Sequence, residues 1–271
     1  MGQPEHVFDR ATALEPRGAG SYRGRLDRDW WIDRGPNGGF LASIILRALM
    51  LEVADATRTP RSLTIHYVAR PVEGVVDLDV TIERVGRSMT ATTARMNQNG
   101  ELLATAQAAF SSVRHGASFD DAPAPEVVSP EDIPALDVPK EMFPRFAWNF
   151  DYRWALGGLP YSSSERALSG GWIRPKEPRA LDALLLTTYS DGWPPAVFAK
   201  LRAPVGVPTV DLTVHYRGTS LEGQSPDWSL VRFETKLAAA GFIEEDGYIW
   251  NRDGTLLAQS RQLALFRGPR D

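Results

Sequence analysis

The stretch Ser62-Leu-Thr-Ile-His-Tyr67 returns almost unchanged as Asp211-Leu-Thr-Val-His-Tyr216, at an offset of 149 residues. A second pair follows in the same order, because Asn99-Gly-Glu-Leu-Leu-Ala104 returns as Asp253-Gly-Thr-Leu-Leu-Ala258 at an offset of 154 residues. Repeats this far apart are too long for a solenoid, whose units stack at much shorter periods. The sequence therefore predicts two tandem copies of one domain.

Both copies show the same predicted order of elements: an early strand, one mostly apolar helix, and four strands separated by turns. The first helix is expected to be mostly buried, because Arg47 and Glu52 are its only charged residues. For the first copy we expect an early strand at 22–31, the helix at 40–54, and strands at 63–68, 76–84, 88–97 and 102–112. For the second copy we expect an early strand at 148–156, the helix at 181–190, and strands at 209–216, 229–239, 241–250 and 256–266.

One central helix followed by an antiparallel meander, twice in one chain, is the element order of a hotdog fold. We therefore predict an α+β double hotdog, in which each of two tandem units wraps an antiparallel sheet around its helix. Between the copies, residues 119–144 hold six prolines, which prevent long regular elements. The predicted organisation is an N-terminal hotdog at 1–113, a proline-rich linker at 114–145 and a C-terminal hotdog at 146–271.

The composition is that of a globular protein and excludes several classes of function. Of the 271 residues, 43% are hydrophobic and 24% are charged, which is enough to form a sizeable core. The absence of cysteine excludes a disulfide framework and a cysteine nucleophile, and favours a cytoplasmic location. Residues 1–14 do not resemble a secretory signal, and the longest apolar stretch, 38–51, is too short to span a membrane. A net charge of -4 offers no large basic surface for nucleic acid.

The common catalytic signatures are missing from the sequence. It contains no G-x-S-x-G elbow, no phosphate-binding glycine loop and no H-E-x-x-H zinc motif. His66 and His215 occupy equivalent places in the repeated strand, so a structural role is the favoured interpretation for both. We expect neither a metal nor a cofactor.

Comparing the two copies identifies polar residues that the shared scaffold does not need. In the last strand, the even positions from 256 to 266 are mostly small and apolar, so this face is predicted to point inward, and Gln262 interrupts it. The offset of 154 residues matches Gln262 with Ala108. An inward amide without a partner would cost about 1 to 3 kcal/mol, so we expect Gln262 to be hydrogen-bonded.

The same comparison singles out a threonine and an aspartate. Thr209 matches Pro60, and Asp191 follows the second helix where the first copy has no carboxylate. A carboxylate beside a hydroxyl and an amide can orient one water molecule and accept its proton. Each residue also has a plain alternative: Asp191 as the end of a helix, Thr209 as an ordinary strand residue, and Gln262 as a satisfied core amide.

Four segments resemble the bacterial acyl-CoA thioesterase II family of double hotdogs. They are Pro36-Asn-Gly-Gly-Phe-Leu-Ala42, Leu184-Leu-Leu-Thr-Thr-Tyr-Ser-Asp191, Pro208-Thr-Val-Asp211 and Asp253-Gly-Thr-Leu-Leu-Ala-Gln-Ser-Arg-Gln262. The resemblance covers nearly the whole chain outside the linker. It implies hydrolysis of an acyl-CoA thioester to free acid and CoA, with Asp191, Thr209 and Gln262 positioning the attacking water. The linker and the polar segment 162–166 depart from the family pattern, which leaves the acyl group undetermined.

Thioester hydrolysis also needs donors for the negative charge that develops on the carbonyl oxygen. Asn37, Gly38 and Gly39 are the candidates, because glycine allows close backbone approach and a helix N-terminus favours negative charge. Tight packing of the helix against its neighbours explains the Gly-Gly pair equally well.

Two rival functions remain. Hotdog enoyl-CoA hydratases of the R-specific type have an aspartate five residues before the catalytic histidine. The positions five before His66, His115 and His215 hold Arg61, Phe110 and Val210, so this rival is disfavoured. A double hotdog that only binds acyl-CoA or an acyl carrier is the other rival. We expect a small-molecule acyl-CoA ligand, no nucleic-acid partner, no membrane span, and a homodimer or higher homo-oligomer.

Overall fold

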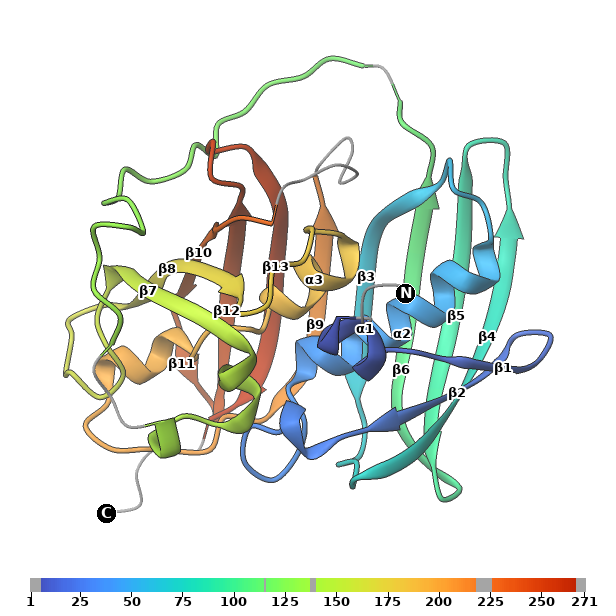
Figure 1. Ribbon diagram of the computed structural model, residues 1–271, viewed down its shortest axis with the longest axis horizontal. Coiled ribbons are helices and arrows are strands. Elements are labelled where there is room, and N and C mark those ends of the chain that lie inside the picture. The colour runs from blue at the N-terminus through green and yellow to red at the C-terminus, as the bar shows by residue number, and fades with distance from the viewer. Residues whose placement is uncertain (1–5, 115, 137–139, 218–225, 267–271) are drawn as a thin grey trace, which may run out of the picture.

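Two hotdog units lie side by side in the computed structural model, which describes residues 6–114, 116–136, 140–217 and 226–266 (Figure 1). The helix of the first unit, α2 (Gly38–Val53), is buried at every side chain from Phe40 to Leu46, as its apolar sequence predicts. The rest of this unit comprises α1 (Val7–Ala11), β1 (Glu15–Gly18), β2 (Ser21–Leu26), η1 (Arg28–Trp30), β3 (Thr59–Tyr67), β4 (Gly74–Val85), β5 (Met89–Gln98) and β6 (Glu101–Ser111).

The second unit repeats the arrangement around a shorter helix, α3 (Ala183–Tyr189), whose side chains are all buried. Its strands are β7 (Phe150–Gly157), β8 (Ala167–Pro175), β9 (Thr209–Tyr216), β10 (Ser229–Thr235), β11 (Ala238–Ala239), β12 (Phe242–Trp250) and β13 (Leu256–Leu265). Short 3-10 turns are η2 (Lys140–Met142), η3 (Arg145–Asn149) and η4 (Ala196–Lys200). The α+β double hotdog predicted from the sequence is confirmed.

The two units share one continuous antiparallel sheet. Its strand order is β1-β2-β4-β5-β6-β3-β9-β13-β12-β10-β8-β7, with β11 paired to β12. β3 and β9 are the two copies of the repeated strand, and they pair with each other at the junction. Thr64 and Thr213, equivalent residues of the repeat, stand opposite each other with their hydroxyl oxygens 3.0 Å apart. The repeat therefore generates a pseudo-twofold axis at this pair.

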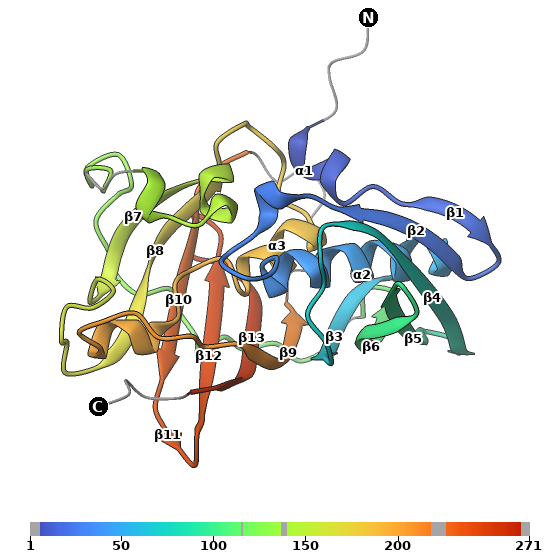
Figure 2. The ribbon, with the colours of Figure 1, turned by 90° about the horizontal axis from the view of Figure 1, so that it is seen from below.

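The two helices pack against each other on the inner side of the curved sheet (Figure 2). Ser43 of α2 donates its hydroxyl hydrogen toward the Leu184 carbonyl of α3 at 2.7 Å. A Cβ atom at Gly39 would lie only 2.7 Å from the Thr188 carbonyl oxygen, so the start of α2 approaches α3 at a distance that only glycine permits. This close crossing brings the N-terminus of α2 to the C-terminus of α3.

One strand of the second unit is missing from the sequence prediction. β8 pairs with β10 as β2 pairs with β4, whereas the predicted early strand corresponds to the outermost strand, β7. Gly170 and Gly171 lie inside β8, where a Cβ would approach the Val231 and Arg153 carbonyl oxygens within 2.2 and 2.0 Å. Such a glycine pair interrupts the apolar alternation that marks a strand, which is why β8 was not predicted.

The linker runs along the second unit (Figure 1), where Ala124, Val127 and Ile133 pack on tryptophans of the sheet. Trp172 and Trp250 donate their indole N–H groups to the carbonyls of Val128 and Ala122, at 2.9 and 3.0 Å. Arg252 adds an ion pair with Glu131. Residues 122–131 of the linker are therefore bound to the second unit.

Candidate active site

Asp191 lies two residues beyond the last residue of α3 and faces the N-terminus of α2, across the junction of the two units. Its Oδ2 accepts hydrogen bonds from Asn37 Nδ2 at 3.0 Å and from the Gly39 backbone N–H at 3.1 Å. Asn37 Nδ2 also donates to the Asp191 backbone carbonyl at 2.6 Å. The first unit thus holds the carboxylate that the second unit supplies.

Asn37 can hold Asp191 because it is itself fixed at the start of α2. Its Oδ1 accepts the Phe40 N–H at 2.8 Å, so it is the N-cap of the helix, and its side chain is fully buried. At Gly38, a Cβ would lie 3.0 Å from Asp191 Oδ2, which requires a small residue there. Tyr67 donates its hydroxyl hydrogen to the Gly38 carbonyl at 2.7 Å and fixes this turn from β3.

Asp191 is partly exposed, yet its carboxylate is strongly desolvated. Burial raises its pKa from 3.8 to about 6. The backbone N–H groups of Gly39 and Gly38 and the side chains of Gln262 and Asn37 oppose this rise by stabilising the charged form. The carboxylate is therefore ionised for the most part at neutral pH, while its proton affinity is higher than that of an ordinary aspartate.

Thr209 and Gln262 are in direct contact at the ends of β9 and β13. The Thr209 hydroxyl donates to Gln262 Oε1 at 3.0 Å. Gln262 is buried, on the inward face that the alternation of β13 predicts. The expectation that this amide is hydrogen-bonded is confirmed. Because Gln262 also stabilises the charged form of Asp191, the three residues belong to one polar cluster.

Strand register supports the comparison of copies that identified these residues. Gln262 pairs with Leu212, and Ala108 pairs with Leu63, the residue equivalent to Leu212. Thr209 pairs with Ala264, as Pro60 pairs with Phe110 at the equivalent position. Aligning the N-caps Asn37 and Asp182 places Leu46 at the position of Asp191. We call Asp191, Thr209, Gln262 and Glu245 the polar site, and Leu46, Pro60, Ala108 and Thr92 its apolar counterpart.

Glu245 is the member of the polar site that the sequence comparison missed. It pairs with Gln262 across β12 and β13, and its Oε1 accepts from Gln262 Nε2 at 2.8 Å. Its equivalent, Thr92, pairs with Ala108. The signal was present, because Glu245 falls on the inward phase of β12 between Ile243 and Gly247.

The candidate oxyanion donors have a partner in this structure. The Gly39 N–H and the Asn37 side chain both donate to the Asp191 carboxylate. The close approach of Gly39 to α3 also agrees with the packing interpretation of the Gly-Gly pair. Their role in stabilising an oxyanion stays a prediction.

Comparison with known proteins gives the family. The acyl-CoA thioesterase N-terminal domain model matches residues 26–111, and the acyl-CoA thioesterase C-terminal domain model matches residues 130–266. No curated protein sequence matches the chain.

Solved structures share the whole fold. A hotdog protein of unknown function from Alicyclobacillus acidocaldarius is 28% identical, with a TM-score of 0.90 and coverage of 98% of this chain and 100% of the other. A putative thioesterase II from Thermobifida fusca is 23% identical, with a TM-score of 0.84 and coverage of 98% and 99%. An acyl-CoA thioesterase II from Mycobacterium marinum is 22% identical, with a TM-score of 0.78 and coverage of 97% and 99%. The last two likenesses concern the fold, and the family models decide membership: the chain belongs to the acyl-CoA thioesterase family of double hotdogs.

Proposed function

We propose that the protein hydrolyses an acyl-CoA thioester to a free acid and CoA, with a water molecule activated by Asp191 and oriented together with Thr209 and Gln262. The observation that carries the proposal is the Asp191 carboxylate itself. It is partly exposed and held by the N-terminus of α2, and burial raises its pKa to about 6. A base whose pKa lies near the working pH is both available and strong enough to accept a proton.

The reaction balances without a further reactant. Asp191 accepts a proton as the water oxygen bonds to the thioester carbonyl carbon, which forms a tetrahedral oxyanion. The oxyanion then collapses, the carbon–sulfur bond breaks, and the thiolate of CoA takes the proton from Asp191. A carbonyl oxygen placed at the start of α2 would share the Gly38 and Gly39 N–H groups with Asp191, and the helix N-terminus would favour its negative charge. The mechanism requires no cofactor, since CoA is part of the substrate.

Among the residues that the structure describes, no histidine belongs to the polar site, although the hydratase alternative would require one. His66 and His215 are both exposed on their strands, in phase opposite to the inward residues Ile65 and Val214. They therefore point away from the helices and from Asp191. No observation favours a protein that only binds acyl-CoA.

Release of free thiol from a panel of acyl-CoAs of increasing chain length tests the proposal. The wild type should hydrolyse at least one member, and the triple variant Asp191→Asn, Thr209→Val, Gln262→Ala should not, while it remains folded by circular dichroism. Turnover that survives the triple replacement would place the chemistry elsewhere. The described part of the chain contains no helix that could span a membrane. The cytoplasmic location and the homodimer stay predictions.

A further inference from the structure

Glu245 is a buried carboxylate that the proposed mechanism leaves without a role. Its side chain is 4% exposed on the inner face of β12. Burying a carboxylate is costly, and the equivalent position in the first unit holds the uncharged Thr92. The hotdog scaffold therefore does not require a charge at this place, and its presence next to Gln262 calls for a function.

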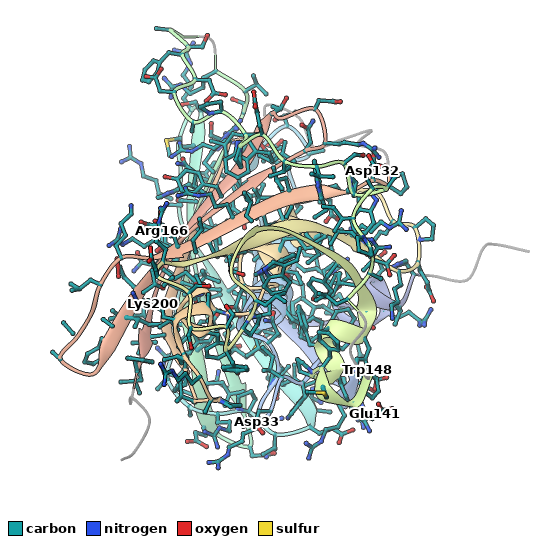
Figure 3. The ribbon with its side chains drawn as sticks, turned by 90° about the vertical axis from the view of Figure 1, so that its left-hand side faces the viewer. Asp33, Asp132, Glu141, Trp148, Arg166 and Lys200 are labelled. Atoms are coloured by element: carbon teal, nitrogen blue, oxygen red, sulfur yellow. The ribbon has the colours of Figure 1, made fainter. Side chains whose placement is uncertain are left out.

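Both oxygens of Glu245 are engaged. Oε1 accepts from Gln262 Nε2 at 2.8 Å, and Oε2 accepts from the Ala196 backbone N–H at 2.5 Å. Ala196 begins η4, and η4 is held in turn by the 158–166 loop, where Ser164 N–H donates to the Ala199 carbonyl at 2.8 Å. In Figure 3, Arg166 and Lys200 mark the two sides of this contact, and Lys200 donates to the Glu165 carbonyl. Glu245 is thus fixed in position from a second element.

Glu245 decides which way the Gln262 amide faces. A glutamine amide has an acceptor end and a donor end, and a threonine hydroxyl can bond to either. Thr209 alone therefore does not select an orientation. A charged carboxylate only accepts, so it requires Nε2 on its own side and leaves Oε1 for the Thr209 hydroxyl, as observed.

We propose that Glu245 is a positioning residue: in its charged form it fixes the orientation in which Gln262 contributes to the water-binding site, so that full activity requires Asp191 and Glu245 both to be ionised. This inference rests on the proposed thioesterase function. The Gln262 amide is the link, because it bonds Glu245 directly and also stabilises the charged form of Asp191.

Protonation would reverse this hydrogen-bond chain. Because Oε2 accepts the Ala196 N–H, a proton on Glu245 goes to Oε1, where it faces the donor end of Gln262. The amide must then turn over so that its oxygen accepts from Glu245 and its nitrogen faces Thr209. The polar group that Gln262 presents to the Asp191 side changes with it.

The surroundings of Glu245 set the pH at which this occurs. Burial is the main cause that raises its pKa to about 7; the hydrogen bonds from the Ala196 N–H and Gln262 oppose the rise, and the nearby carboxylates of Asp191 and Asp246 contribute to it. From β10, Glu234 and Arg232 point to the other face of the sheet, since they are out of phase with the inward Phe233 and Thr235. The pH range of the reversal therefore lies close to neutrality.

Glu245→Gln mimics the protonated state. Its new oxygen must accept the Ala196 N–H, so its new amide nitrogen faces Gln262 and turns that amide over at every pH. At pH 8, we expect kcat to fall about 10- to 100-fold, with KM changed less than about threefold, because orientation and not substrate affinity is altered. On the acid side, log kcat should rise more steeply in the wild type, with a slope between about one and two, than in the variant, with a slope of about one.

Two further variants control the result. Glu245→Asp restores a group that only accepts and should recover part of kcat and the steeper slope. Glu244→Gln makes the same chemical change on the neighbouring residue of β12, whose carboxylate accepts from the Lys236 and Leu237 backbone, and should leave both unchanged. Should Glu245→Gln fold poorly, Glu245→Thr, which copies Thr92, and the wild-type slope still test the proposal.

Asp191→Asn distinguishes a failure of the proposed role of Glu245 from a failure of the proposed thioesterase mechanism. Loss of activity in Asp191→Asn, together with wild-type kcat and slope in Glu245→Gln, would overturn the role of Glu245 and leave the thioesterase proposal intact. Wild-type activity in Asp191→Asn would overturn the thioesterase mechanism. In that case the side-chain amide resonance of Gln262, assigned by its loss in Gln262→Ala, should still shift between pH 5 and pH 8 in Asp191→Asn, where Asp191 no longer titrates, but not in the double variant Asp191→Asn, Glu245→Gln. A resonance that behaves alike in both proteins would refute the orientation argument itself.

Discussion

The polar site and its apolar counterpart occupy equivalent places about one pseudo-twofold axis and are built for different tasks. The polar site holds two carboxylates, a hydroxyl and an amide, and all four side chains are at least partly buried. The counterpart holds Leu46, Pro60, Ala108 and Thr92, all of them buried. The same fold is therefore formed around both sets. The counterpart residues show which side chains the scaffold needs for stability. The buried polar side chains of the polar site are not needed for the fold, and burying them costs stability.

The comparison also shows that the polar site depends on both units. The second unit supplies all four of its residues, but the first unit supplies Asn37 and Gly39, which hold the Asp191 carboxylate. The difference between the polar site and its counterpart thus includes the N-cap residue of each helix. Asp182 caps α3 where Asn37 caps α2, so the counterpart has a carboxylate at the position from which the polar site receives an amide donor.

Replacing Asp191, the proposed base, should remove the catalytic difference between the polar site and its counterpart. Asp191→Asn keeps the shape of the side chain and an oxygen for the Gly39 N–H, but it cannot accept a proton at neutral pH. We expect turnover to fall about 10²- to 10⁴-fold with the fold retained, measured by thiol release at saturating acyl-CoA. Asp77→Asn, at a surface carboxylate paired with Arg23, is the matched control and should retain wild-type turnover. Equal activity in the two variants would remove Asp191 from the mechanism.

The cost of the polar site should appear as a dependence of stability on pH. Because burial raises the pKa of Asp191 to about 6, the folded state binds this proton more tightly than the unfolded state does. Stability from this group is therefore lost as pH rises from about 4 to about 7, and the loss is complete above that range. Asp191→Asn lacks this titration. The free energy of unfolding of the wild type should fall over this range by about 1 to 3 kcal/mol more than that of the variant, in urea titrations at each pH. Parallel curves would show that Asp191 carries no such penalty.

The smallest expected effect is at the counterpart itself. Substituting glutamine at Ala108 supplies the amide, but Leu46 and Pro60 still occupy the places of Asp191 and Thr209. We expect no gain in activity, and a non-hydrolysable acyl-CoA analogue should still saturate near one tight equivalent per chain by calorimetry. Two equivalent tight sites in the wild type would mean that the counterpart also binds substrate, and the functional contrast between the sites would fail.

The repeat made much of this predictable from sequence alone. The matched strands fixed two offsets, and those offsets gave the register in which Gln262 stands opposite Leu212 and Ala108 opposite Leu63. Burial of the even positions of β13 followed from their alternation. Because strand register and side-chain phase are local consequences of the pattern, a single sequence was enough to assign them.

Other features depend on contacts that no local pattern encodes. The hydrogen bonds from Asn37 and Gly39 to Asp191 arise where two helices cross, more than 150 residues apart in sequence. The sequence does not predict β8, because its two glycines, which allow close approach to neighbouring strands, interrupt the apolar alternation. The sequence does not identify Glu245, because the two copies share no clear sequence match along β5 and β12. Without a match, no offset relates Glu245 to its equivalent in the first copy.

The pairing of β3 with β9 also has a consequence for how the protein folds. Within each unit, strands such as β5 and β6 or β12 and β13 join residues close in sequence, whereas Thr64 meets Thr213 across 149 residues. Contacts between distant residues form slowly, because a long loop must close before they gain anything. We therefore expect each unit to collapse around its own helix first and the junction to form last. Enzymatic activity regained during refolding would then report the docking of two preformed halves, and it should lag behind the recovery of secondary structure.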